Sequence, residues 1–456
     1  MREARIVIIG AGSTIYALEV IKDLCGNSRL AQSHVWFVDV NPERLRISLT
    51  LCRRYAQEVG SAIEITGTTE RAEALRSADF VISTALTLGY DKMLQGWDLA
   101  EKYGFRQDGS LHLIYDEAFW VNFYQLQLFE GIVEDMLALC PEAWFFMVSN
   151  PVMAGVTYLG RKYPQAKVAG VCHGYREIFS ILQELGLDPD KATWDIPGSN
   201  HFVWLNAFTY DGRNAFPLLD QWIAEKGEAY WASGSDKVRW GTLGRKLIDL
   251  YRIHGVLPIG DTAHWIANNW PWWYSGTDTE RAAWDQPPLR EKWMGFFDIL
   301  AREQQARLEL ADDPTRKVSE AYPGKSDEHI IDMVDAIAND QPGDFVVNIL
   351  NTDNLVPGVP LDFEVEVKAR LSAGGLQTRP SKPLPRSVLA HLLRDRIAPV
   401  ETELAAFERG SYDLLVELIL MDRWAPSKQA AEAFLDDLLA LPWNTRMKTH
   451  YARTGR

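Results

Sequence analysis

The chain has 456 residues, of which 47% are hydrophobic and 24% are charged, and it carries a formal net charge of −15. This length and composition predict a large core, most naturally two packed domains. The negative charge, with no compensating basic run, argues against nucleic acid or an anionic membrane surface as a partner. No apolar run approaches the roughly 20 residues of a membrane span, and the N-terminus lacks a signal-sequence pattern. With only four cysteines, we expect a cytoplasmic protein without a disulfide framework.

The first third of the chain alternates strand and helix patterns. The β-branched run ARIVIIG is typical of a strand buried on both faces, and a helical pattern follows the turn GAGST. A second strand, HVWFVDVN, precedes a charged helix over Pro42–Glu58. The strands AIEITG and DFVISTA then lie on either side of a short helix near residues 72–75. This alternation predicts an α/β fold with a Rossmann-like, doubly wound parallel sheet.

The turn after the first strand has the features of a dinucleotide site. Gly10 permits a tight turn, and Gly12 lets a pyrophosphate approach the backbone at a helix N-terminus, where Ser13 and Thr14 add hydroxyl donors. Asp39, at the end of the second strand, would accept hydrogen bonds from a ribose diol and repel a 2′-phosphate, which favours NAD over NADP. The third glycine of the usual fingerprint is absent, so an ordinary strand-to-helix turn is the alternative.

Two separate segments each carry one candidate metal ligand beside small or polar turn residues. Cys172 lies in GVCHGYREI, and His201 lies in GSNHFVWL. A thiolate and an imidazole suit a first-row divalent ion, and two protein ligands would leave positions for the oxygens of a substrate. A buried cysteine packed beside a hydrogen-bonded histidine is the alternative. Asn150 ends the strand pattern WFFMVSN, where open α/β sheets bind ligands, although an amide there equally suits a cap on the following turn.

The composition changes after the GSNHFVWL segment. Amphipathic helical patterns over residues 217–226 and 236–254 precede GVLPIGDTAHW, which contains Asp261 and His264, and the aromatic run WIANNWPWWYSG ends this part. Tryptophan faces stack on sugar rings, but a tryptophan cluster in a core or a subunit interface is the alternative. DFVVNILNTDNLVPGVPLDFEVEVKARL predicts an antiparallel hairpin, and the rest is mostly helical. We expect an NAD-binding domain over residues 1–197 and a mixed α/β catalytic and oligomerisation domain over residues 198–456.

A nicotinamide, a divalent metal and a loop carboxylate together serve two classes of reaction. NAD⁺ would take a hydride from a secondary alcohol, the metal would hold the alcohol and its neighbour, and a carboxylate or tyrosine would move protons. In a hydroxy-acid or polyol dehydrogenase the ketone is the product. In the other class the ketone acidifies the adjacent carbon–hydrogen bond and so permits elimination of a leaving group. The residues alone leave both classes open, together with a non-catalytic, redox-sensing dinucleotide binder.

Several collinear motifs resemble glycoside hydrolase family 4, the NAD- and manganese-dependent glycosidases. They are GAGST, SNP at residues 149–151, VCHG at 171–174, GSNHFVWL, and PIGDT at 258–262. The hairpin and the closing helices also follow the family's order, so the resemblance covers nearly the whole chain. It implies NAD and Mn²⁺ as cofactors, a small glycoside as substrate, and a homodimer or homotetramer.

The resemblance also implies roles for individual residues. It assigns the cofactor to Gly10, Gly12, Ser13 and Asp39, the metal to Cys172 and His201, and the sugar hydroxyls to Asn150, with Asn200 beside the metal histidine. Asp261 matches the base of the α-glucosidase and α-glucuronidase branch, and Asp116, in LIYDEAFW, lies in the region associated with acid assistance to the leaving group. In the implied mechanism NAD⁺ oxidises sugar carbon 3, Asp261 removes the proton from carbon 2, and the aglycone leaves carbon 1 before water adds and the hydride returns. This differs from the two-carboxylate scheme of most glycosidases.

The CHG sequence at residues 172–174 indicates a non-phosphorylated sugar, because it resembles the α-glucosidase and α-glucuronidase group. His173 within it is a predicted substrate contact. Arg176 could bind a uronate carboxylate in a two-point fork, which favours α-glucuronides, while a solvated helix residue is the alternative. His264, another predicted substrate contact, stands where that group usually has an arginine, so α-glucosides and α-galacturonides stay open. A malate- or lactate-dehydrogenase-like oxidoreductase is the alternative of another class.

Overall fold

The computed structural model describes residues 3–106, 111–113, 117–234, 243–260, 262, 273, 277–284, 289–326 and 328–452. Within these ranges twelve strands join in one mixed sheet, and three more form a small separate sheet. Half of the large sheet has the order β3-β2-β1-β4-β5-β6, and every neighbouring pair in it is parallel. These strands are β1 (Arg5–Ile9), β2 (His34–Val38), β3 (Glu64–Thr68), β4 (Phe80–Ser83), β5 (Trp144–Met147) and β6 (Lys167–Gly170). The order is that of a Rossmann fold, which confirms the predicted fold class.

The apolar strands of this half are buried on both faces. In β1, Ile6 and Ile8 face one apolar layer and Val7 and Ile9 face the other, because successive side chains of a strand point to opposite sides. The helices α1 (Thr14–Gly26) and α2 (Pro42–Glu58) belong to the first layer, and α5 (Phe119–Leu139) and α6 (Val152–Lys162) belong to the second. Helices on both faces explain why these strands are apolar throughout rather than alternating.

The sheet continues without a break into an antiparallel half. β13 (Gly343–Leu350) pairs with β6 through Asn348 and Gly170, and it pairs with β14 (Glu364–Ser372) along its full length. The predicted antiparallel hairpin is therefore confirmed. The order continues from β14 through β8 (Gly198–Ser199) and β9 (Phe202–Leu205) to β12 (Leu257–Ile259), and β15 (Gly375–Thr378) pairs with β14. One sheet thus spans the two domains expected from the sequence.

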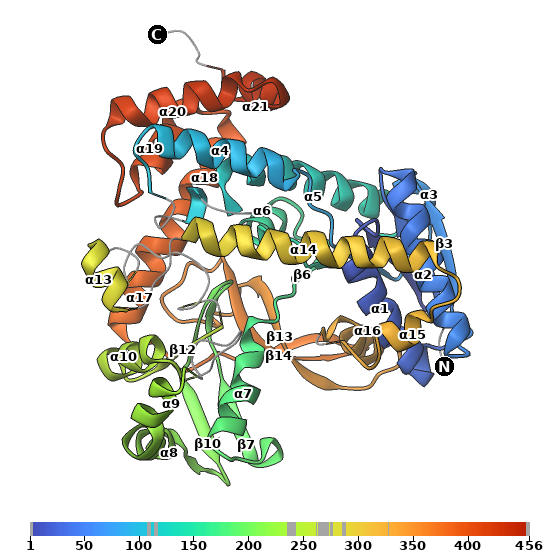
Figure 1. Ribbon diagram of the computed structural model, residues 1–456, viewed down its shortest axis with the longest axis horizontal. Coiled ribbons are helices and arrows are strands. Elements are labelled where there is room, and N and C mark those ends of the chain that lie inside the picture. The colour runs from blue at the N-terminus through green and yellow to red at the C-terminus, as the bar shows by residue number, and fades with distance from the viewer. Residues whose placement is uncertain are drawn as a thin grey trace.

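The other elements surround this sheet (Figure 1). The small sheet contains β7 (Ala192–Asp195), β10 (Ala207–Tyr210) and β11 (Arg213–Asn214). The remaining α-helices of the described ranges are α3 (Arg71–Leu75), α4 (Tyr90–Lys102), α7 (Glu177–Glu184), α8 (Phe216–Trp222), α9 (Glu228–Ala232), α10 (Arg245–His254), α13 (Asp278–Ala283), α14 (Leu289–Asp312), α15 (Val318–Ala321), α16 (Ile330–Ala338), α17 (Arg386–Leu392), α18 (Ala398–Arg409), α19 (Tyr412–Leu420), α20 (Lys428–Ala440) and α21 (Thr445–His450). The end of the chain is mostly helical, as its sequence predicts.

Segments from the second half of the chain complete the first half. The long helix α14 runs across the molecule in Figure 1 and packs against α1 and α2, and α16 packs against α1. At the other end, Phe434 of α20 makes edge-to-face contacts with Phe119 and Trp120 at the start of α5. Helices of the second half therefore pack against the helices of the parallel half at both of its ends.

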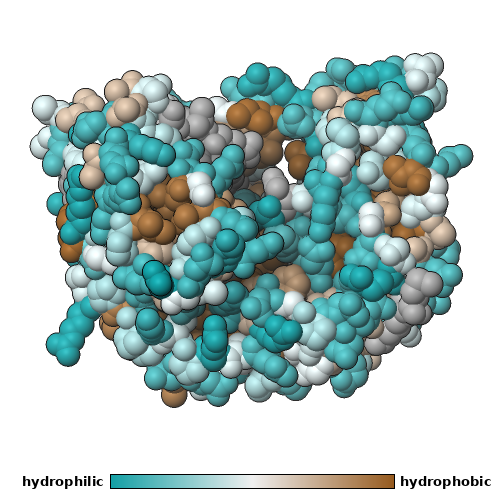
Figure 2. Space-filling view, turned by 90° about the horizontal axis from the view of Figure 1, so that it is seen from below, coloured by the Kyte–Doolittle hydropathy of each residue, from teal (hydrophilic) through white to brown (hydrophobic). Residues whose placement is uncertain are grey.

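One face of the protein is mainly polar. Figure 2 shows hydrophilic residues over most of one face, with hydrophobic residues gathered in a few patches. Within the described ranges, no helix is both long enough and apolar enough to cross a bilayer. All four cysteines are free thiols, which agrees with the expected absence of a disulfide framework.

Candidate functional site

The predicted cofactor turn and the Cys172 segment lie at the same edge of the sheet. Gly10 follows β1 and packs so closely on the segment after β4 that a Cβ atom there would lie 2.5 Å from the Cα of Ala85. The backbone N–H of Ser149, after β5, donates to the carbonyl of Ser83 at 3.2 Å. The N–H of Val171, after β6, donates to Met147 at 2.8 Å. The carboxyl ends of parallel strands meet here, and this is where α/β sheets of this kind bind ligands.

The GAGST turn fits a dinucleotide. Gly10 has a φ of +90°, and a Cβ atom at Gly12 would lie 2.5 Å from Oδ2 of Asp39. That oxygen accepts the Gly12 N–H at 2.8 Å, so Asp39 holds the turn. Ser13 begins α1 without a side-chain capping bond, and the N-terminus of a helix attracts anions. Thr14 is buried, and its hydroxyl donates to Gln304 at 3.3 Å, away from the turn.

The structure brings Cys172 and His201 together. Cys172 follows β6, His201 lies between β8 and β9, and the cysteine sulfur is within hydrogen-bonding reach of the imidazole. Burial disfavours the imidazolium, but hydrogen bonds to Cys172 and Glu117 and the negative charges of both residues outweigh it and raise the pKa of His201 well above its ordinary value. In the part of the chain that the structure describes, no set of three Cys, His, Asp or Glu could hold a metal. A thiolate and an imidazole fit a first-row divalent ion.

A buried carboxyl pair lies beneath this pair of ligands. Glu364 and Glu366 are 0% and 1% exposed on the same side of β14. The Ser199 hydroxyl donates to Glu364 at 2.6 Å, and the Asn200 side-chain amide donates to Glu366 at 3.2 Å. Burial, with the Glu366 charge, raises the pKa of Glu364 to about 8, despite the hydrogen bond from Ser199. Glu364 is therefore mainly protonated near neutral pH.

The same network reaches the Cys172 segment through Asn348. With its amide nitrogen turned toward the two carboxyl groups, Asn348 donates to Glu364 at 2.7 Å and to Glu366 at 3.0 Å. Asn348 also pairs in the sheet with Gly170, two residues before Cys172. A single buried polar cluster thus supports both ligand segments.

The PIGDT segment lies against both ligand segments. Gly260 has a φ of +60°, and a Cβ atom there would lie 2.6 Å from the carbonyl oxygen of Gly174. The Thr262 hydroxyl donates to the Val203 carbonyl at 3.0 Å and accepts the Val203 N–H at 2.8 Å. Gly260 is therefore held against the Cys172 segment, and Thr262 is held against the His201 segment. Asp261 itself, Asp116 and His264 lie outside the described residues, as does most of the tryptophan run.

Comparison with known proteins identifies the family. The model of family 4 glycosyl hydrolases matches residues 5–187, and the model of the C-terminal domain of the same family matches residues 196–425. The chain belongs to glycosyl hydrolase family 4. This confirms the resemblance seen in the motifs.

Relatives within family 4 share the architecture at low sequence identity. The chain is 24% identical to an α-galactosidase of Bacillus subtilis, over 80% of each protein, and 24% identical to an α-glucosidase of Erwinia rhapontici, over 97% of this chain and 99% of that one. It is 23% identical to an α-galacturonidase of Thermoanaerobacterium saccharolyticum, over 92% of each. A 6-phospho-α-glucosidase from gut microorganisms, solved with NAD and Mn²⁺, superposes with a TM-score of 0.76 at 16% identity, over 96% of this chain and 98% of that one.

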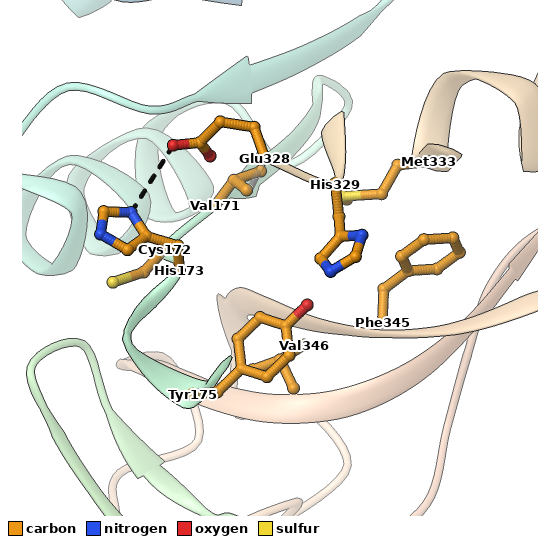
Figure 3. Close-up of a pocket in the computed structure, with 9 residues that line it drawn as sticks. All are labelled: Val171, Cys172, His173, Tyr175, Glu328, His329, Met333, Phe345 and Val346. Carbon is orange, nitrogen blue, oxygen red and sulfur yellow. Dashed lines mark ion pairs between the residues drawn. The ribbon is translucent and has the colours of Figure 1, made fainter. Parts of the chain in front are cut away.

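The predicted substrate contacts of this family 4 chain occupy different environments. His173 is half-exposed and forms an ion pair with Glu328 at 3.7 Å, at one side of the pocket in Figure 3. Arg176 contacts the ring of His329 and lies 5.9 Å from the centre of the Phe179 ring. Asn150 is partly exposed at the edge of the sheet, whereas Asn200 is fully buried in the carboxyl cluster. Their contacts with a sugar stay predictions.

Sequence reasoning missed the carboxyl groups that surround the ligand pair. Glu364 and Glu366 leave a trace in the sequence, because acidic residues at alternate positions of an otherwise apolar strand must share one face. Glu117, the carboxylate beside His201, gives no such signal, because it is not part of an alternating strand pattern. Of these residues, Glu117 adds negative charge beside His201.

Proposed function

We propose that the protein is an NAD- and Mn²⁺-dependent glycosidase that cleaves non-phosphorylated α-glycosides, with α-glucuronides as the first candidate substrate. The observation that carries the proposal is the contact of Cys172 with His201 at the edge of the sheet where the GAGST turn also lies. A family 4 relative of the same fold was solved with NAD and Mn²⁺. The curated α-galactosidase and α-glucosidase relatives support an α-linked substrate without phosphate.

In this proposal the residues of the chain have separate tasks. NAD and the metal, when bound, supply reversible oxidation at sugar carbon 3 and positive charge beside the oxygens on carbons 2 and 3. The turn at residues 10–13 and Asp39 hold the dinucleotide, and Cys172 and His201 hold the metal. Asp261 takes the proton from carbon 2, and Asp116 protonates the departing oxygen. A substrate ketone formed in this way acidifies the carbon that Asp261 deprotonates.

A uronic acid is the proposed sugar. The CHG sequence supports a non-phosphorylated substrate, and the α-galacturonidase relative shows that the family includes an enzyme named for a uronide. The guanidinium of Arg176 contacts His329, and His329 lines the same pocket as Cys172, so a cationic group lies near this pocket. An α-glucosidase or an α-galacturonidase is the second candidate, favoured by relatives of those names.

The test is hydrolysis of aryl glycosides by the purified protein with NAD⁺, Mn²⁺ and a reductant. We expect release of the phenol from the α-glucuronide, exchange of the carbon 2 proton in deuterated water, and no net NADH. Parallel assays on the α-glucoside, the α-galacturonide and the β-glucuronide rank the substrates. Release that persists in Cys172→Ser after exhaustive chelation would remove the metal from the mechanism. NADH that accumulates in proportion to substrate, without cleavage, would select a dehydrogenase.

Location and assembly are part of the same proposal. We expect the enzyme to act in the cytoplasm as a homodimer or homotetramer, with a small glycoside as its partner. Light scattering coupled to size-exclusion chromatography tests the assembly, and a monomer at micromolar concentration would contradict it. The division at residues 197 and 198 stays a prediction, since one continuous sheet crosses it.

A further inference from the structure

The His201 ring is held from the side by a buried carboxylate. Nδ1 of His201 lies 2.7 Å from Oε1 of Glu117, and the two side chains are only 10% and 5% exposed. A carboxylate oxygen can only accept, so Nδ1 carries the proton and donates it to Glu117. Nε2 is then the ring nitrogen on which a metal would bind.

Glu117 is itself fixed by a second layer of polar groups. The Asn122 side-chain amide donates to the Glu117 carbonyl at 3.0 Å, which fixes the turn at the start of α5. Asn122 also hydrogen bonds with Glu403 of α18, and burial raises the pKa of Glu403 to about 8. Asn122 and Glu403 therefore place no second negative charge behind Glu117 near pH 7.

The backbone of His201 is held from the same direction. His201 has a φ of +58°, a conformation that residues other than glycine adopt only when neighbouring contacts stabilise it. Nη2 of Arg396, a buried residue, donates to the His201 carbonyl at 3.1 Å, and the guanidinium lies 5.9 Å from the centre of the Phe202 ring. Glu117, Arg396, Asn122 and Glu403 line one cavity. Two residues that line this cavity therefore orient His201: Glu117 holds its ring, and Arg396 holds its main chain.

We propose that Glu117 is a positioning residue for the metal ligand His201. By accepting the Nδ1 proton it selects one tautomer, fixes the ring angle and directs Nε2 toward the Cys172 sulfur. A metal-bound histidine that loses such a carboxylate partner commonly loses 10- to 100-fold in metal affinity. The inference rests on the proposed metal dependence, and it concerns a residue that the motifs of the chain do not assign.

The test is direct Mn²⁺ binding, measured by the loss of the free-ion signal in electron paramagnetic resonance. We expect Glu117→Ala to bind Mn²⁺ about 10- to 100-fold more weakly than the wild type. Glu117→Gln keeps an oxygen that can accept the Nδ1 proton, so we expect it to recover most of that loss. NAD⁺ affinity, read by tryptophan fluorescence, should stay within about 2-fold in both variants, which shows that the fold is intact.

A matched control is Asp335→Asn, which removes another buried carboxylate, one that pairs with Arg29. It should leave Mn²⁺ affinity unchanged even if the protein melts at a lower temperature. Unchanged Mn²⁺ affinity in Glu117→Ala would overturn the role of Glu117, and so would an equal loss in the Asp335 control. If the wild-type protein binds no Mn²⁺, the proposed function fails instead, so the two failures are distinct.

Discussion

Replacement of the buried Glu403 by glutamine should stabilise the protein as the pH rises. Glu403 is 3% exposed, and burial raises its pKa from 4.5 to about 8. The folded protein therefore keeps a proton that the unfolded chain releases above about pH 4.5. The stability that this group contributes is complete below that pH and is lost as the pH approaches 8. Glutamine has no titratable proton, and its side-chain oxygen can still accept a hydrogen bond from Asn122.

The size of the effect follows from the difference between the pKa of Glu403 in the unfolded chain and its pKa in the folded protein. Each pH unit between the two pKa values changes the free energy of unfolding by about 1.4 kcal/mol, so the advantage of Glu403→Gln should reach roughly 4 kcal/mol by pH 8. Chemical unfolding at pH 5, 6.5 and 8 measures this difference in the free energy of unfolding. The control is Glu408→Gln, because Glu408 is an exposed residue of the same helix. The Glu403 variant should converge with the wild type near pH 5 and separate from it at pH 8. Parallel curves for all three proteins would refute the assignment of a neutral Glu403.

Three further predictions concern other buried groups. Burial lowers the pKa of His112 from 6.5 to about 3, so the protein should lose stability as the pH falls below about 6.5, and His112→Leu should flatten that loss in thermal scans at pH 4 to 7. Gly260→Ala places a Cβ atom 2.6 Å from the Gly174 carbonyl oxygen, in a residue with a φ of +60°. The rate of glycoside cleavage should therefore fall at least about 10-fold, and the melting temperature should fall as well. A variant that cleaves at the wild-type rate would contradict the importance of this contact. Glu364→Ala leaves the Ser199 hydroxyl and the Asn200 backbone N–H without their acceptor, so the free energy of unfolding, measured by chemical unfolding, should fall by about 2 to 4 kcal/mol. Replacement of the exposed Asp362 by alanine, the control, should change that free energy by less than about 0.5 kcal/mol.

The sequence predicted the elements whose pattern is local. The β-branched run at residues 4–10, the helix over Pro42–Glu58 and the hairpin of β13 and β14 all formed as expected, because hydrophobic period and turn residues act over a few positions. The GAGST turn was recognised for the same reason. Cys172 and His201 were each proposed as ligands from their segments, but their contact depends on the pairing of β8 with β14 and of β13 with β6.

The carboxyl groups around the site are the clearest example of what local patterns miss. Glu117 lies 84 residues before His201, and Glu364 lies 164 residues after Asn200. The sequence alone does not distinguish a buried acidic residue from a solvent-exposed one, because burial depends on the folded environment. The pKa values of Glu364 and Glu403, both raised by burial to about 8, are therefore properties of the folded chain.

The sequence by itself determined the Rossmann-like fold class, the family and the residue types that can bind a metal, because these follow from short patterns and from side-chain chemistry. Only the tertiary structure decided that one sheet joins the two halves, that Cys172 meets His201, and that Glu117 and a neutral Glu403 lie behind the ring. Burial and long-range strand pairing set these features, since both depend on which distant residues are brought into contact.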